Sequence, residues 1–90
     1  MTRTVFFVSD GTGITAETLG HSILTQFKSL ECKHVTLPFV VSDETTHSTV
    51  AKINAVGQKD GHKPIVFSTL VDEAHREILR RCDGLVMDLF

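Results

Sequence analysis

The residues best suited to chemistry lie in one short segment near the start of the chain, Ser9-Asp10-Gly11-Thr12-Gly13-Ile14-Thr15. The segment, here called the glycine loop, follows an apolar run and precedes a helical pattern. The free N–H groups at the start of a helix can hold an anion, and glycines allow the backbone to approach a ligand closely. A purely structural turn is the alternative. The candidate phosphate- or substrate-binding residues are Ser9, Asp10, Gly11, Thr12, Gly13 and Thr15.

The glycine loop also satisfies the loose G-x-G-x-x-G/A pattern of dinucleotide-binding loops through Gly11, Gly13 and Ala16. That pattern alone has low specificity. The acid that such proteins carry about twenty residues further on has only a late counterpart in Asp43, and the carboxylate of Asp10 would repel a pyrophosphate. The pattern therefore does not assign a dinucleotide to this loop.

Ser68 and Thr69 are two further candidates, at the end of another apolar run. In an open α/β sheet, ligands bind in the crevice outside the carboxyl ends of the strands, where the winding direction reverses. We expect both residues to face the glycine loop across that crevice, and helix capping is an equally consistent interpretation. The segment Ser42-Asp43-Glu44 ends a different run at the same edge, where capping is favoured.

Histidine and cysteine spacing predicts no metal site, and the sequence assigns no catalytic role to any residue of this chain. No two of the five histidines have the i, i+4 spacing and acid partner of a helical zinc site. The two cysteines lie far apart without C-x-x-C spacing, so we expect reduced, partly buried thiols. These residues are His21, His34, His47, His62, His75, Cys32 and Cys82.

Four apolar runs that could position the candidate residues are predicted as strands, at about residues 4–8, 35–41, 64–68 and 85–89. A helix is predicted in each interval, which gives a β-α-β-α-β-α-β order. The first helix starts at Ile14, and apolar residues spaced by four, four and three trace one stripe of it. That stripe comprises Leu19, Ile23, Phe27 and Leu30.

The other two helices have recognisable starts. Ser42 is the predicted cap of the second helix, whose inner face comprises Val50, Ile53 and Val56. Thr69 and Asp72 have the spacing of a capping box for the third helix. In this third helix we expect inward-facing Val71, Ala74, Ile78 and Cys82, and solvated Arg76, Arg80 and Arg81.

The strand order follows from Pro38 and from chain handedness. Because Pro38 lacks an N–H donor, the second strand should lie at a sheet edge. Right-handed crossovers then favour a four-stranded parallel sheet in the order 2-1-3-4, an α/β fold that resembles half of a Rossmann-like or flavodoxin-like domain. The first helix lies alone on one face. One helix cannot cover four strands, so we expect a helix from further along a longer protein to cover the third and fourth strands.

Composition limits the class of protein. Ninety residues with 41% hydrophobic and 22% charged content suit one globular domain. A net charge of -2, with both signs spread along the chain, provides no positive surface for nucleic acid or an anionic membrane. The longest apolar run, Val5–Val8, is too short to span a bilayer, and no secretory signal precedes it, so we expect a cytoplasmic protein.

Three stretches of the sequence resemble the bacterial phosphoenolpyruvate synthase regulatory proteins, a family with a close branch that regulates pyruvate, phosphate dikinase. Together they cover essentially all ninety residues. They are V-F-F-V-S-D-G-T-G-I-T-A-E-T-L-G-H-S-I-L-T-Q-F at 5–27, P-F-V at 38–40 and G-L-V-M-D-L-F at 84–90.

The resemblance implies a bifunctional enzyme. Members of the family use ADP to phosphorylate a threonine of the target synthase, which inactivates it. They use inorganic phosphate to remove that group, releasing pyrophosphate. ADP and phosphate are therefore the implied cofactors. Phosphoenolpyruvate synthase or pyruvate, phosphate dikinase is the implied partner, and a second copy of the chain is a further candidate.

The nucleotide site of that family is a P-loop of the G-x-x-x-x-G-K-[ST] type. None of the five lysines in this chain follows a glycine. The resemblance therefore implies that residues 1–90 form the N-terminal α/β domain of a longer protein, with the P-loop kinase part beyond them, and that these residues alone are inactive. Two alternatives are a self-contained nucleotide- or phosphate-binding Rossmann-like module and a purely structural or dimerisation domain.

Overall fold

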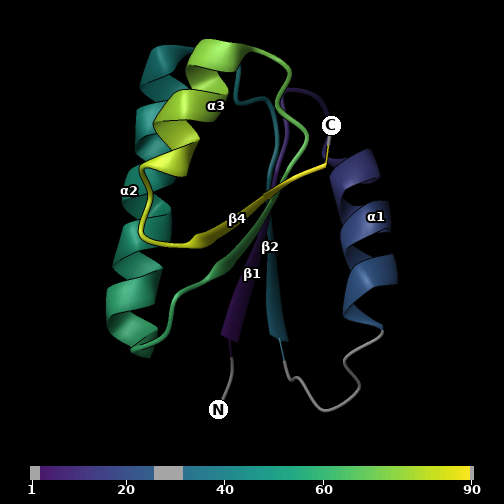
Figure 1. The fold of residues 1–90 in the computed structure, drawn as a ribbon, viewed down its shortest axis with the longest axis vertical. Coiled ribbons are helices and arrows are strands. Elements are labelled where there is room, and N and C mark those ends of the chain that lie inside the picture. Colours follow the sequence, from purple (N-terminus) through teal and green to yellow (C-terminus); the bar gives the residue numbers. More distant parts are fainter. Residues whose placement is uncertain (1–2, 26–31, 90) are drawn as a thin grey trace.

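The computed structural model of the chain describes residues 3–25 and 32–89, which form three layers of helix, sheet and helix (Figure 1). Within these residues the four strands form one parallel sheet in the order β2-β1-β3-β4, so the predicted fold class and strand order are confirmed. The elements are β1 (Arg3–Val8), α1 (Ile14–Leu24), β2 (Cys32–Leu37), α2 (Asp43–Asp60), β3 (Ile65–Ser68), α3 (Glu73–Arg80) and β4 (Leu85–Asp88).

The second strand lies at the sheet edge as predicted, but its predicted bounds of 35–41 were wrong. It pairs with β1 from Cys32 to Leu37 and ends there. Pro38 has no N–H for the ladder, and Phe39 has a φ of 59°, outside the extended region. The regular ladder therefore ends at Leu37, and the N–H groups of Phe39 and Val40 donate to the carbonyls of Gly11 and Ser9, which follow β1.

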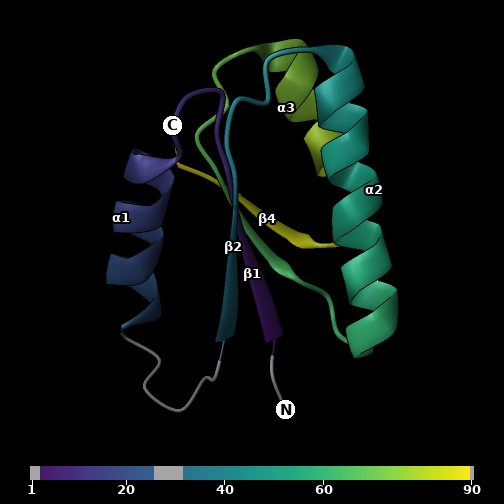
Figure 2. The same cartoon turned by 180° about the vertical axis from the view of Figure 1, so that it is seen from behind.

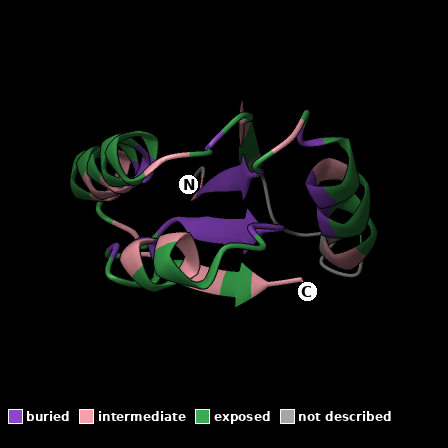
Figure 3. Ribbon diagram, turned by 90° about the horizontal axis from the view of Figure 1, so that it is seen from above, coloured by how far each residue is buried: buried purple, intermediate pink, exposed green. Residues whose placement is uncertain are grey.

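The two faces of the sheet are covered as predicted, by α1 on one side and by α2 and α3 on the other (Figure 2). Because a strand points successive side chains to opposite faces, the continuous apolar runs of β1 and β3 supply both cores. Viewed from above, these strands are buried between the helical layers (Figure 3). Phe6, Val8 and Val66 pack with Ile53 and Leu79 on one face, and Val5, Phe7 and Phe67 pack with Ala16 on the other.

The face that α1 presents to the sheet differs from the prediction. Leu19, expected to point inward, is 40% exposed. Ala16 and Gly20 are buried instead, and Ile23 is partly buried. A Cβ on Gly20 would lie only 3.0 Å from the Cδ1 atom of Phe7, so the helix packs close to the sheet through its smallest residues. Phe27 and Leu30 lie outside the described residues.

The helix α2 begins as predicted. The Oγ atom of Ser42 accepts a hydrogen bond from the Thr45 N–H at 3.1 Å, and the Thr45 hydroxyl accepts one from the Ser42 N–H at 3.0 Å. This reciprocal pair satisfies two N–H groups at the helix start. Ile53 is buried as expected, while Val50 and Val56 are partly buried against the same core.

The cap and the inner face of α3 differ from the prediction. Asp72 is the cap, and its Oδ1 atom accepts hydrogen bonds from the N–H groups of Ala74 at 2.9 Å and His75 at 3.2 Å. The N–H of Thr69 instead donates to the Val8 carbonyl, which continues the strand pairing. The inward residues are Leu79 and Cys82, with Ile78 partly buried, whereas Val71 and Ala74 are exposed.

The uncovered sheet face lies on the side of α1, as expected, but it is narrower than predicted. On β4, Leu85 is 44% exposed and Met87 is 43% exposed. On β3, by contrast, Ile65 and Phe67 are buried. The ring of Phe67 stacks on that of Phe7, with ring centroids 5.8 Å apart. The expectation of exposed apolar side chains is therefore right for β4 and wrong for β3.

Candidate functional site

Backbone hydrogen bonds hold the glycine loop against the segment that follows β2. The Ser9 N–H donates to the Leu37 carbonyl at 3.1 Å, and the Val40 N–H donates to the Ser9 carbonyl at 2.9 Å. A third hydrogen bond joins the same two segments, in which the Phe39 N–H donates to the Gly11 carbonyl at 2.9 Å. The loop therefore has a fixed position at the carboxyl edge of the sheet.

Gly13 sets the direction in which α1 leaves the loop. It is the N-cap residue with a φ of 87°, a left-handed conformation that favours glycine. A Cβ at this position would lie 2.7 Å from the Cγ2 atom of Thr36. No described side chain caps the helix, whose backbone bonding begins with the Glu17 N–H donating to the Gly13 carbonyl. The N–H groups of the first turn before Glu17 have no acceptor within the helix.

The loop borders a shallow depression with a volume of about 240 Å³. Thr69, only 3% exposed as a whole residue, contributes to its wall, so the structure brings it to the glycine loop. Ser68 is not part of the lining: its Oγ atom accepts a hydrogen bond from the Leu70 N–H at 3.2 Å, a contact within its own turn. The lining comprises Ser9, Asp10, Gly11, Thr12, Gly13, Ile14, Thr15 and Thr69.

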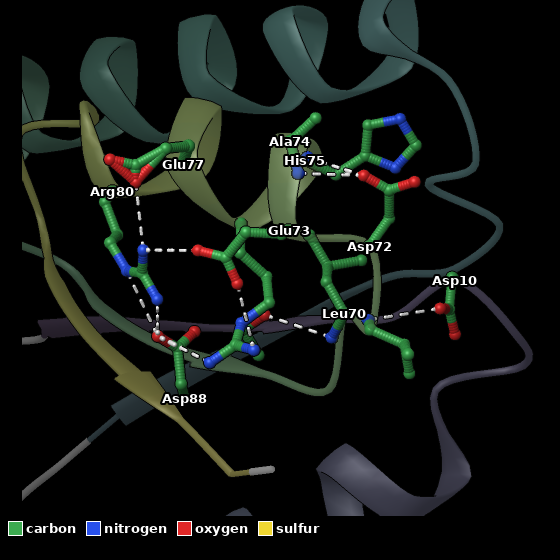
Figure 4. A network of polar contacts seen from close by, with 12 residues as sticks. Asp10, Leu70, Asp72, Glu73, Ala74, His75, Glu77, Arg80 and Asp88 are labelled. Atoms are coloured by element: carbon green, nitrogen blue, oxygen red, sulfur yellow. Dashed lines mark hydrogen bonds and ion pairs between the residues drawn. The ribbon is translucent and has the colours of Figure 1, made fainter.

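The charges around the depression oppose a bare anion. The lining contains the carboxylate of Asp10 but no lysine or arginine. Asp10 reaches across the crevice and accepts a hydrogen bond from the Val71 N–H at 3.4 Å (Figure 4). Glu17 lies in the first turn of α1, where it adds a second negative charge beside the positive end of the helix dipole. A phosphate held here would need a cation that these described residues do not supply.

Sequence reasoning missed four exposed apolar residues at the same edge of the sheet, here called the apolar rim (Ile14, Phe39, Val41 and Val71). Each residue follows the carboxyl end of a strand and is between 61% and 66% exposed. Phe39 is the most unusual of the four, because a bulky residue rarely adopts a positive φ. The sequence signal that could have drawn attention to Phe39 is the resemblance of P-F-V at 38–40 to the family named above.

A network of charges joins α3 to β4 behind this edge (Figure 4). The Oδ2 atom of Asp88 lies 3.2 Å from Nη2 of Arg80 and 3.7 Å from Nη2 of Arg76. Arg80 also pairs with Glu77 at 3.0 Å. Only 22% of the Arg76 side chain is exposed, so the prediction that it is solvated was wrong. The network links the side chains of α3 to the end of β4.

The structure places two of the histidines in contact on the face of α1. The rings of His21 and His34 lie 4.7 Å apart between centroids, and both contact Phe7. Burial and the neighbouring His21 lower the pKa of His34, and Glu17 opposes that effect. Across residues 3–25 and 32–89, no three His, Cys, Asp or Glu side chains are arranged to hold a metal ion.

Among the described residues, no helix is both long and apolar enough to cross a membrane. Burial raises the pKa of the Cys82 thiol, which makes it a packing residue and a poor nucleophile at neutral pH.

Comparison with known proteins identifies the family. A family model described as kinase/pyrophosphorylase matches residues 5–90. The chain therefore belongs to the kinase/pyrophosphorylase family. The resemblance drawn from the glycine loop and the two later stretches is thus confirmed.

Curated relatives in this family carry a consistent, provisionally assigned name, phosphoenolpyruvate synthase regulatory protein. One from Alcanivorax borkumensis is 63% identical over 90 residues, and others from Pseudomonas fluorescens and Marinobacter nauticus are 48% and 47% identical. Each match covers all of this chain but 33% of the relative. The chain thus spans about a third of the length of these relatives.

Proposed function

We propose that this chain is the N-terminal α/β part of a regulatory enzyme that inactivates and reactivates phosphoenolpyruvate synthase. The observation that carries the proposal is the family match over residues 5–90, together with relatives of up to 63% identity named for regulation of that synthase. No lysine follows a glycine in this sequence. The proposal therefore assigns the P-loop that binds ADP to the remaining two thirds of the protein.

The proposed enzyme catalyses two phosphoryl transfers on one threonine of the synthase. In the kinase direction, the threonine oxygen attacks the β-phosphorus of ADP, AMP leaves, and the hydroxyl proton is released. In the pyrophosphorylase direction, an oxygen of inorganic phosphate attacks the phosphothreonine, pyrophosphate forms, and the threonine hydroxyl is restored. Positioning and charge stabilisation account for most of the catalysis of such transfers.

The proposed role of this chain is to hold the target at the carboxyl edge of its sheet. The apolar rim offers a surface for a protein partner. The first-turn N–H groups of α1 beside it suit the phosphate of a phosphothreonine or a free phosphate ion. Because the depression contains Asp10 and no cation, the glycine loop acts as a positioning site, and the cationic groups come from the P-loop part.

The test combines the full-length protein with purified phosphoenolpyruvate synthase. With ADP, mass spectrometry should find phosphate on one threonine of the synthase, and synthase activity should fall. Adding inorganic phosphate without ADP should release pyrophosphate and restore activity. Failure to modify the synthase under either condition would refute the proposal. Tight binding of ADP by residues 1–90 alone would instead support a self-contained nucleotide-binding module.

A further inference from the structure

On the sheet face that carries α1, the strip over β4 is apolar and has no helix over it among the described residues. The side chains of Leu85 and Met87 point to this face and are 44% and 43% exposed. Leu89, just beyond β4, is partly buried against the core on the same side. The alternate residues Val86 and Asp88 point to the opposite face, where α3 covers them. The sequence of β4 is thus suited to burial on both faces, although only one is covered.

One side of α1 borders this exposed strip. Successive residues of an α-helix are about 100° apart, so Leu19 and His21 are about 200° apart around α1. His21 contacts His34 of β2, on one flank of the helix. Leu19, 40% exposed, therefore lies on the other flank, which faces β3 and β4. We call the surface between them the uncovered trough, formed by Leu19, Leu85, Met87 and Leu89, with Ile65 and Phe67 beneath it.

The uncovered trough is narrower than a helix. Neighbouring strands lie about 4.8 Å apart, and an α-helix with its side chains is about 10 Å across. Because α1 packs on β1 and reaches Phe67 of β3 at Gly20, and Ile65 and Phe67 are buried, the open part of this face lies over β4. A helix packed on β4 would therefore also contact the flank of α1 that carries Leu19.

The topology indicates where that helix comes from. Right-handed connections from β2 to β3 and from β3 to β4 place α2 and α3 on the opposite face. The three helices of the described residues are therefore already positioned, and none of them covers the trough. The curated relatives are about three times as long as the matched region, which leaves ample chain to supply another helix.

We propose that an amphipathic helix from the part of the full-length protein outside residues 1–90 covers the uncovered trough. Its apolar stripe contacts Leu19, Leu85 and Met87, and its polar face points to solvent. This contact fixes the α/β domain on the rest of the same polypeptide. The inference rests on the greater length of the relatives and on the exposed apolar side chains of β4. It is independent of the kinase and pyrophosphorylase activities.

Oxidation of Met87 by hydrogen peroxide tests whether the trough is covered. In the full-length protein, an Ala55→Met variant places a reference methionine on the exposed surface of α2, on the opposite layer. Met87 should oxidise at least about tenfold more slowly than this reference, at every protein concentration. Equal oxidation rates would overturn the proposal, because the trough would then be open. Protection that appears only at high concentration would also overturn it, by identifying a second copy as the occupant.

Photocrosslinking from position 87 identifies the occupant. A benzophenone-bearing amino acid replaces Met87 in the full-length protein, and the crosslinked peptides are sequenced by mass spectrometry. The expected product joins position 87 to a helical segment outside residues 1–90 of the same molecule. A crosslink to phosphoenolpyruvate synthase, or to a second copy of the protein, would contradict the proposal. The outcome does not depend on whether the protein phosphorylates its target.

Discussion

Replacing Gly13 by alanine should destabilise the fold through two separable effects. The left-handed φ of 87° costs an alanine about 1–2 kcal/mol. The new Cβ would lie 2.7 Å from Cγ2 of Thr36, well inside van der Waals contact, and relieving that overlap costs about 1 kcal/mol more. The smaller entropy of the unfolded alanine chain offsets about 0.5–1 kcal/mol. The net expectation is a loss of about 2 kcal/mol in the free energy of unfolding.

Chemical denaturation followed by far-ultraviolet circular dichroism is the suitable assay, because the chain has no tryptophan or tyrosine for fluorescence. A Thr36→Ser variant is the matched control, since it removes only the methyl group that the new Cβ meets. The Gly13→Ala, Thr36→Ser double variant should recover the overlap part, about 1 kcal/mol, and keep the backbone part. A Gly13→Ala variant as stable as the wild type would refute the left-handed cap and the close approach of β2.

Three further predictions use the same assay. Gly20→Ala should destabilise by about 1–2 kcal/mol even though alanine favours helices, because its Cβ would press on the ring of Phe7; a stabilised variant would contradict the close packing of α1. Ser42→Ala should cost about 1 kcal/mol through the lost cap of α2, and no loss would show that the cap is dispensable. Burial and the neighbouring His21 lower the pKa of His34, so the folded state favours the neutral ring. The free energy of unfolding should therefore be largest above the unfolded pKa of 6.5 and decrease as the pH falls below that value. The His34→Gln variant should lose less stability on the acid side. A dependence of the free energy of unfolding on pH that is the same in the variant and the wild type would contradict this role of His34.

The strand order could be predicted from the sequence because it depends on local and general rules. Pro38 marked the edge strand, and handedness then fixed the order. The bounds of β2 could not be predicted in the same way. They depend on its register with β1, in which Arg3 pairs with Cys32 and Val8 with Leu37. Such pairing between distant segments leaves no mark in the pattern of a single strand.

The face of α1 was mispredicted for a physical reason. Hydrophobic periodicity gives weight to large side chains such as Leu19, whereas the closest contacts with the sheet are made by Ala16 and Gly20. The cap of α3 was ambiguous because Thr69 and Asp72 are both good caps. Only the structure reveals that the N–H of Thr69 is used in strand pairing.

The position of the glycine loop at a strand end was predictable, since it directly follows a buried apolar run. The apolar rim was not. Phe39 has a left-handed backbone conformation, and its N–H donates a hydrogen bond to the carbonyl of Gly11, which is far from it in sequence. The negative charge of Asp10 was apparent from the sequence, whereas the lack of a lysine or arginine in the described lining of the depression was not, because it depends on which side chains meet there in space.

If the glycine loop serves the phosphoryl reactions, as we propose, substitutions in it should impair them. The measurement compares both reactions of the full-length protein with those of its Asp10→Ala and Gly13→Val variants. Thermal unfolding is recorded alongside, so that the stability loss expected at Gly13 is separated from loss of function. We expect at least one reaction to fall by about tenfold or more while each variant remains folded at the assay temperature. Wild-type rates for both reactions in both variants, with an unchanged dependence on phosphate, would contradict the claim and make the loop a structural turn.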